Sequence, residues 1–147
     1  MLVETPAAPA AAHPGFEPLR APPGFVREIG GFHVHDELDV VALRVRPEHL
    51  NSIGIAHGGF LATLADSAFG VLIKRQCGLL NPPATVTLNM DYIGPARAGD
   101  WLQAEVEVHK VGRRLTNASC LLKVGERLVA RASGVFIMAA PAAGEGG

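Results

Sequence analysis

The stretch His57–Gly70, HGGFLATLADSAFG, decides how the rest of the chain is arranged. It predicts a helix that begins with a histidine and two glycines, and apolar residues occur nearly all round it. The one acidic side chain in this stretch is Asp66. A helix that is apolar on every face is expected to be buried on every face. We therefore expect its own sheet to cover one side and a partner subunit to cover the other.

The sequence around this helix predicts an α+β fold. The helix should run from Gly58 to about Gln76, because Gly78 and the Asn-Pro-Pro that follows are typical of a helix end. Upstream, residues 32–45 alternate loosely and predict a strand or hairpin. Downstream, Val-, Thr- and Leu-rich runs are separated by short glycine-containing connections, as in antiparallel hairpins. These runs are Ala84–Ile93, Trp101–Val111, Leu115–Val124 and Arg127–Met138. We expect an antiparallel sheet of five to six strands wrapped round one long central helix.

The ends of the chain differ from its middle. Residues 1–24 and 140–147 are rich in Ala, Pro and Gly, and we expect both segments to be flexible tails. This leaves residues 25–139 as one domain, which fits a chain of 147 residues.

The composition limits where in the cell the protein is expected to be and what it is expected to bind. The chain is 48% hydrophobic and 18% charged, with a net charge of −1. The lack of a basic excess argues against a nucleic-acid partner. No run reaches the roughly 18 apolar residues of a membrane helix, and the N-terminus lacks a basic region, so neither a membrane span nor a signal peptide is expected. Cys77 and Cys120 are predicted to be reduced thiols in a cytoplasmic protein.

Asp66 is the first candidate for a catalytic group. Its neighbours one turn away, Ala62, Phe69 and Gly70, include no basic partner. Burying a carboxylate without compensation is costly and is expected to raise its pKa, and such acids are candidates for functional sites. The alternative that Asp66 reaches solvent or pairs with an arginine from elsewhere stays open at this point.

The start of the helix supplies a second candidate. Because Gly58 and Gly59 carry no side chains, a carbonyl oxygen can approach the unpaired N–H groups there, as in an oxyanion hole. A loop-to-helix turn that needs small residues would also explain the glycines. Asp66 lies roughly 12 Å further along the axis, too far to reach the same atom in one subunit. If two subunits pair antiparallel, Gly58 of one can face Asp66 of the other, which predicts a dimer.

Other chemistries find less support in the sequence. His57 and Asp66 are too far apart on one helix for a serine-type triad, and no serine lies in a G-x-S-x-G elbow. His33 and His35 lie on alternate positions of a predicted strand without an evident third ligand, so no metal site is expected. Leu72, Ile73 and Leu80 are candidates for an acyl pocket whose chain length the sequence does not define.

The stretch NSIGIAHGGFLATLADSAFG, residues 51–70, resembles the signature of hotdog-fold thioesterases of the phenylacetate-degradation (PaaI-like) type. The pattern is an Asn, a Gly three residues later, His-Gly-Gly, and then Leu-x-Asp on the central helix. The resemblance continues through TVTLNMDYIGPARAGD, VHKVGRRLTNASCLL and ERLVARASGVF, and it covers about residues 25–138. It implies a hotdog fold and a homodimer or homotetramer with its sites at the dimer interface.

The resemblance also implies an activity, the hydrolysis of acyl-coenzyme A thioesters. Asp66 would attack the thioester or activate a water, and the Gly58 N–H would polarise the carbonyl. His57 would support that carbonyl, and Asn51 would orient the nucleophile or water. Thr85 matches a hydroxyl that relatives often supply from the other subunit. Further substrate contacts are expected from Gly59, Phe69, Arg97, Arg113 and Arg114, with the arginines as candidates for the coenzyme A phosphates.

A thioester is already activated and a thiolate is a good leaving group, so no metal and no cofactor besides the coenzyme A of the substrate is expected. Two alternatives share the fold. A non-catalytic acyl-CoA-binding module has little reason to retain Asp66. A hotdog hydratase or dehydratase would use a histidine paired with an acid at other spacings, and His-Gly-Gly is not its pattern.

Overall fold

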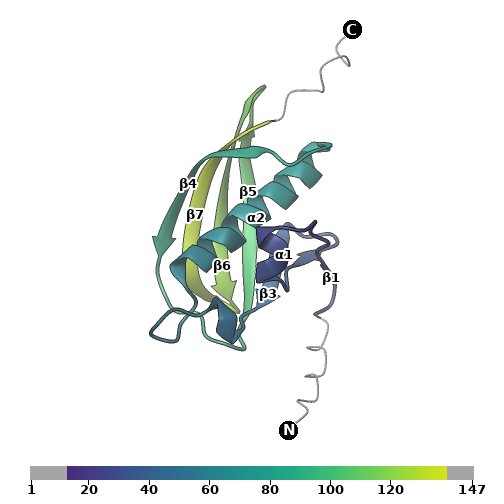
Figure 1. Cartoon of the computed structure of the whole chain (residues 1–147). Coiled ribbons are helices and arrows are strands. Elements are labelled where there is room, and N and C mark those ends of the chain that lie inside the picture. The colour runs from purple at the N-terminus through teal and green to yellow at the C-terminus, as the bar shows by residue number, and fades with distance from the viewer. Residues whose placement is uncertain (1–12, 139–147) are drawn as a thin grey trace.

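The long helix α2 (Gly58–Cys77) lies across an antiparallel sheet that curves round it, in a computed structural model that describes residues 13–138 (Figure 1). The sheet has seven strands in the order β1-β2-β3-β5-β6-β7-β4. The remaining helical elements are α1 (Phe25–Ile29) and a 3-10 turn at Pro47–His49. The strands are β1 (Phe16–Pro18), β2 (His33–His35), β3 (Val40–Arg44), β4 (Ala84–Tyr92), β5 (Trp101–Val111), β6 (Leu115–Val124) and β7 (Arg127–Ile137). This arrangement confirms the predicted hotdog fold.

The folded unit begins before the predicted boundary. β1 pairs antiparallel with β2, with Phe16 opposite His35, and the Leu19 N–H donates to Phe32 O at 2.8 Å. The expectation of a tail over residues 1–24 is therefore wrong for residues 13–24. A three-residue strand is too short to show alternation, which is why the sequence predicted only five to six strands. Residues 1–12 and the predicted C-terminal tail at 140–147 lie outside the described residues.

Both ends of α2 follow from its sequence. At the start, His57 Nδ1 accepts a hydrogen bond from the Gly59 N–H at 2.9 Å and caps the first turn. At the end, Gly78 adopts the left-handed conformation, φ 62°, in which its N–H reaches the carbonyl groups of the last turn. These two residues therefore set where the helix begins and ends.

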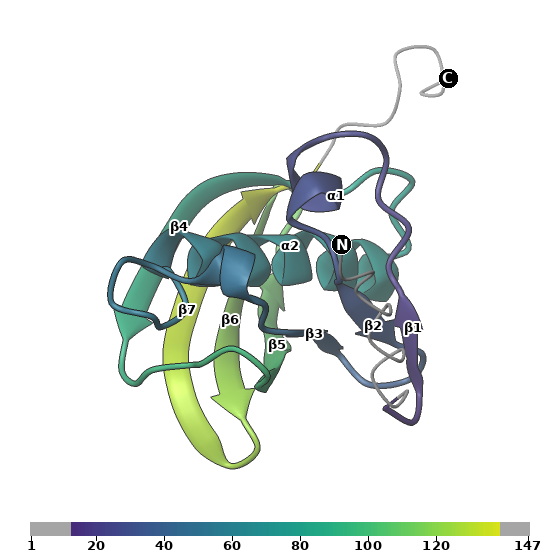
Figure 2. The same cartoon turned by 60° about the horizontal axis from the view of Figure 1, so that its bottom comes forward.

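The core lies between α2 and the concave face of the sheet (Figure 2). Each large side chain buried there contributes about 1.5–3 kcal/mol of hydrophobic stabilisation. The buried residues of the helix are Phe60, Leu61, Leu64, Ala65, Ala68, Phe69, Leu72 and Ile73. From the sheet they meet, among others, Val41, Leu43, Leu102, Leu122 and Phe136.

The helix is not apolar all round, which corrects the sequence interpretation. Phe69 and Ile73, candidates for substrate contact and for an acyl pocket, are fully buried in the core. The face that the sheet leaves uncovered carries small and polar residues instead, and these residues are half-buried or exposed. Its residues include Thr63, Asp66, Ser67, Gly70 and Lys74.

β4 forms one edge of the sheet and is exposed along most of its length. On its inner side it pairs with β7, with Ala84 opposite Ile137 and Tyr92 opposite Ala130. Its outer edge meets no other strand in the part of the chain that the structure describes.

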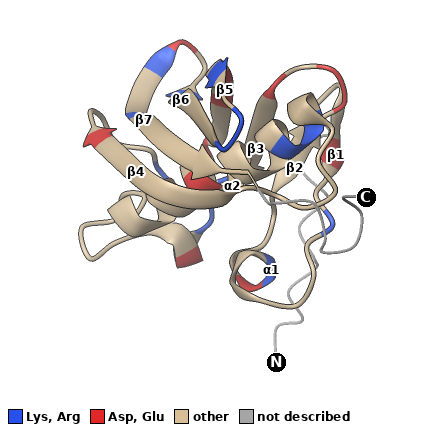
Figure 3. Ribbon diagram, turned by 90° about the horizontal axis from the view of Figure 1, so that it is seen from above, with Lys and Arg blue, Asp and Glu red and all other residues tan. Residues whose placement is uncertain are grey.

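Charged residues of both signs are interspersed over the elements (Figure 3), in keeping with the net charge of −1. Within residues 13–138, no helix is long and apolar enough to cross a membrane.

Candidate active site

Asp66 and Thr85 form a hydrogen-bonded pair on the uncovered face of α2. Thr85, the second residue of β4, donates from Oγ1 to Asp66 Oδ1 at 2.6 Å. The sequence led us to expect a buried Asp66 and a hydroxyl from the other subunit, but in the single chain Asp66 is exposed and the hydroxyl is its own. The bond occupies one carboxylate oxygen and leaves Oδ2 available for chemistry.

The first turn of α2 is held by Tyr92 at the far end of β4. The Tyr92 hydroxyl donates to Gly58 O at 2.9 Å, and a Cβ built on Gly58 would lie 3.3 Å from the tyrosine ring. Gly59 donates to the His57 ring, and the Leu61 N–H donates to His57 O. Among the described residues, the first-turn donors left without a partner are the N–H groups of Gly58 and Phe60, so Gly58 retains the donor expected of it.

A buried histidine, His49, packs against the first turn of α2. Its Nδ1 accepts the Arg46 N–H at 3.0 Å, its Nε2 lies 3.2 Å from Ile29 O, and its ring stacks on Phe60 with centroids 4.1 Å apart. Burial, with a smaller contribution from the charge of Arg46, lowers the pKa of His49 below its usual value, although the hydrogen bond to Ile29 opposes the shift. His49 is thus a neutral ring that holds the loop before α2.

Sequence reasoning missed both His49 and Tyr92. The contacts that tie them to α2, His49 to Phe60 and Tyr92 to Gly58, join residues 11 and 34 positions apart, so no local pattern signals either contact. The one available hint was composition, since Tyr92 is the single tyrosine of the chain.

Asn51 and His57 have local roles in the single chain. Asn51 Oδ1 accepts the N–H groups of Ile53 at 3.0 Å and Ile55 at 3.2 Å, and so fixes the loop before the helix. His57 caps α2 through Nδ1, which leaves Nε2 of this exposed ring free of protein partners among residues 13–138.

A pocket of about 710 Å³ opens beside the Asp66–Thr85 pair. Its floor is the uncovered face of α2, and residues 82–85 form one wall. The opposite wall is residues 19–26, which belong to the segment that the sequence had placed in a tail. The α2 residues in the lining are Asp66, Ser67, Gly70, Val71 and Lys74.

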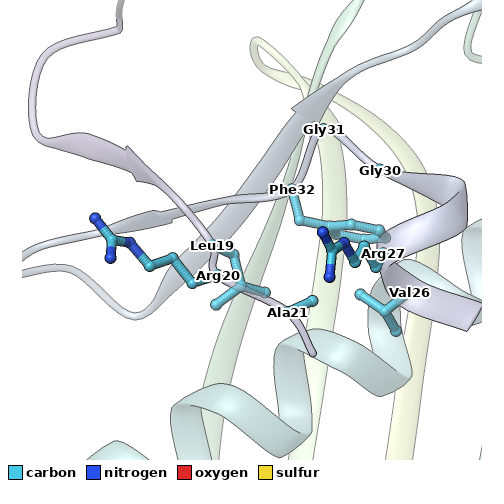
Figure 4. Close-up of a pocket in the computed structure, with 8 residues that line it drawn as sticks. All are labelled: Leu19, Arg20, Ala21, Val26, Arg27, Gly30, Gly31 and Phe32. Carbon is cyan, nitrogen blue, oxygen red and sulfur yellow. The ribbon is translucent and has the colours of Figure 1, made fainter. Parts of the chain in front are cut away.

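A smaller pocket of about 440 Å³ lies inside the loop of residues 19–32 (Figure 4). The two pockets share part of this loop as a common wall. Figure 4 shows the Arg27 guanidinium beside the Phe32 ring, whereas Arg20 extends away from the other labelled side chains. None of the candidate catalytic residues lines this pocket, so it is not the candidate active site.

The structure does not gather the three candidate phosphate-binding arginines in one place. Arg97 follows Ala96, whose carbonyl accepts the Ala56 N–H in the loop just before α2. Arg113 and Arg114 lie in the β5–β6 turn, at the end of the sheet where Leu115 and Ala84 both pair with Ile137. Arg113 and Arg114 therefore lie at the same end of the sheet as Thr85, whereas Arg97 lies elsewhere.

Phe69 does not line the pocket beside Asp66. Its ring is fully buried and packs against Phe136 with centroids 4.8 Å apart. Within the described residues, no group of three or more His, Cys, Asp or Glu side chains is placed to hold a metal ion.

Comparison with known proteins shows the family to which the chain belongs. A family model described as the thioesterase superfamily matches residues 53–133. The chain is 43% identical to a Pseudomonas aeruginosa protein that bears the provisional name of an esterase, over 83% of this chain and 93% of that protein. It is 32% identical to human acyl-coenzyme A thioesterase 13, over 63% and 66% of the two chains.

A solved structure is also similar. A mutant of the phenylacetic acid degradation protein PaaI from Thermus thermophilus superposes with a TM-score of 0.67 and 34% identity. The match covers 76% of this chain and 96% of that one.

Proposed function

The chain belongs to the thioesterase superfamily, as an acyl-coenzyme A thioesterase of the PaaI-like type, and we propose that it uses Asp66 and the Gly58 N–H at sites shared by two subunits. The observation that carries the proposal is the Asp66–Thr85 pair in the lining of a pocket of about 710 Å³. A carboxylate with one oxygen held and the other free is oriented for attack or for proton transfer.

Asp66 supports two chemical routes to the same products. In the first, Oδ2 attacks the thioester carbonyl, the carbon–sulfur bond breaks, and water hydrolyses the resulting anhydride. In the second, Asp66 takes a proton from a water that attacks the same carbon. In both, the carbonyl oxygen gains negative charge that an N–H donor stabilises, and coenzyme A leaves as a thiolate. Neither route calls for a metal or a further cofactor.

The position of β4 supports a shared site. Thr85 at one end of this strand contacts Asp66, and Tyr92 at the other end contacts Gly58. An exposed edge strand is a ready template for pairing with another strand. If two β4 strands pair antiparallel about an axis near Leu88, Thr85 of each chain faces the partner strand close to its Tyr92 end. The same operation brings Asp66 of one subunit toward Gly58 of the other.

The proposal is tested by thiol release from aryl-, phenylacetyl- and short- to long-chain fatty acyl-CoAs. We expect Asp66→Asn to lower kcat by about 10³-fold or more, because the variant loses the nucleophile or base. Asp36→Asn, at an exposed aspartate in the β2–β3 turn, is the matched control. Wild-type rates in Asp66→Asn would contradict the proposal, and binding without hydrolysis by the wild type would favour an acyl-CoA-binding module.

A further inference from the structure

The pocket beside Asp66 is lined by two cationic side chains that the reaction does not use, Arg20 from the loop before α1 and Lys74 from the same helix as Asp66. Lys74 stands two turns after Asp66 on α2, with Gly70 between them, and all three line the pocket. Side chains four residues apart share a helix face, and a helical side chain leans toward the start of its helix. The Lys74 ammonium is therefore expected to lie along the pocket, on the Asp66 side of its own Cα.

Lys74 differs in its contacts from its neighbour Arg75. Arg75 donates to His35 O and Leu38 O and pairs with Asp39 at 3.1 Å, so its charge is used to hold the β2–β3 turn against the helix. Lys74 makes no ion pair with any carboxylate of residues 13–138. Its charge is free for a ligand.

The space between Asp66 and Lys74 is largely apolar. Gly70 carries no side chain over the floor, and a Cβ built there would make an ordinary contact with Pro82 Cβ at 3.9 Å. Prolines stiffen both walls because their ring fixes the backbone angle φ. The apolar lining consists of Leu19, Ala21, Pro22, Pro23, Phe25, Val26, Val71, Pro82 and Pro83. Such a pocket fits the hydrocarbon part of an acyl group with an anion at its far end.

We propose that this pocket binds the acyl group, and that Lys74 selects acyl groups with a terminal carboxylate, the thioesters of short dicarboxylic acids. The proposal rests on the function proposed above, because it takes Asp66 as the reacting group. Asp66 and Lys74 are roughly 12 Å apart along the axis. The backward lean of the lysine reduces this gap to about the length of a five- or six-carbon dicarboxylyl chain. The longer pantetheine arm keeps the coenzyme A phosphates beyond that reach.

The test compares glutaryl-CoA with pentanoyl-CoA, which have the same chain length and differ in a terminal carboxylate or methyl group. We expect the wild type to prefer glutaryl-CoA by about 10-fold in kcat/KM, the effect of one charge-assisted hydrogen bond from an exposed lysine. Lys74→Met keeps the side-chain length and removes the charge, so the preference should disappear. Lys110→Met, at an exposed lysine on β5, is the matched control and should retain it.

Two further measurements distinguish a contact of Lys74 with the acyl group from one with the coenzyme A phosphates, and a loss of binding from a loss of hydrolysis. With N-acetylcysteamine thioesters, which have no phosphates, the Lys74→Met effect should persist; an effect confined to the CoA esters, or equal for both acyl groups, would overturn the proposal. Calorimetry measures how tightly each of the two CoA esters binds. It therefore reports any preference for the acyl group with the terminal carboxylate, even if the wild type hydrolyses neither ester. The enzymatic function fails only if the wild type also hydrolyses none of the aryl-, phenylacetyl- and fatty acyl-CoAs, whereas equal binding by wild type and Lys74→Met would overturn the role of Lys74.

Discussion

The Thr85 hydroxyl donates a 2.6 Å hydrogen bond to Asp66 Oδ1, so the edge strand β4 is joined to the middle of α2 at the candidate nucleophile. A short bond to a charged acceptor is among the stronger hydrogen bonds in proteins. It restrains the carboxylate that is otherwise exposed on the helix surface. Thr85 is therefore a positioning residue in the proposed reaction.

Removing this hydroxyl should slow catalysis. We expect Thr85→Val, which keeps the shape of the side chain, to lower kcat by about 10- to 100-fold, and Thr85→Ser to restore most of the rate. The measurement is steady-state thiol release with kcat and KM determined separately. Because a positioning role acts on kcat, a change in KM alone would contradict it.

The proposed dimer makes a prediction about β4 register. With an axis near Leu88, the exposed side chain of Thr87 in one strand faces Asn89 in the other. The double variant Thr87→Lys/Asn89→Lys places like charges across the interface and should shift the protein toward monomer. Thr87→Lys/Asn89→Glu places opposite charges there and should remain dimeric. Light scattering at micromolar concentration checks both, and a monomeric wild type would refute the shared site.

His49 predicts how stability depends on pH. Its pKa in the folded protein is lowered from 6.5 by burial, so below about pH 6.5 the unfolded chain binds a proton that the folded chain does not. The contribution of His49 to stability is thus complete above that pH and is lost as the pH falls toward its folded pKa, with a slope of up to about 1.4 kcal/mol per pH unit.

The measurement for His49 is urea unfolding between pH 8 and pH 5. His49→Gln can still accept from the Arg46 N–H and donate to Ile29 O, but it does not titrate. We expect its free energy of unfolding to fall less steeply with acid than that of the wild type. Parallel pH profiles for the two proteins would show that His49 titrates alike in the folded and unfolded states.

Much of the fold was predictable because α2 and the four long strands repeat their patterns over nine or more residues. The bounds of β5 and β6 were predicted to the residue. β1 and α1 were missed because three and five residues carry no periodic signal. The missed segment matters for function, since residues 19–26 wall the pocket beside Asp66.

The site was predicted in its parts but not in its contacts. Asp66, Gly58 and Thr85 were candidates from the sequence, yet the bond between Asp66 and Thr85 in one chain and the support of Gly58 by Tyr92 depend on how β4 lies beside α2. Phe69, expected to contact the substrate, lies in the core instead, because a curved sheet covers a wider arc of the helix than a flat one. Such contacts arise from packing between distant segments.

The last prediction concerns the Gly58 N–H, which a proline can remove without breaking the helix. Gly58 is the first residue of α2, where proline is tolerated, and His57 before it is extended with φ −64° and ψ 137°, as a residue preceding proline requires. Gly58→Ala is the matched control, because its Cβ meets the same Tyr92 ring but the N–H remains. We expect Gly58→Pro to lower kcat by about 10²-fold relative to Gly58→Ala.

Mixing two inactive variants then tests whether the site is shared. If each site combines Asp66 of one subunit with Gly58 of the other, a heterodimer of Asp66→Asn and Gly58→Pro has one site with both defects and one with neither. Subunit exchange should therefore restore activity up to half that of the wild type per heterodimer. If both groups came from the same subunit, every site in the mixture would keep one defect and thiol release would stay at the level of the parents.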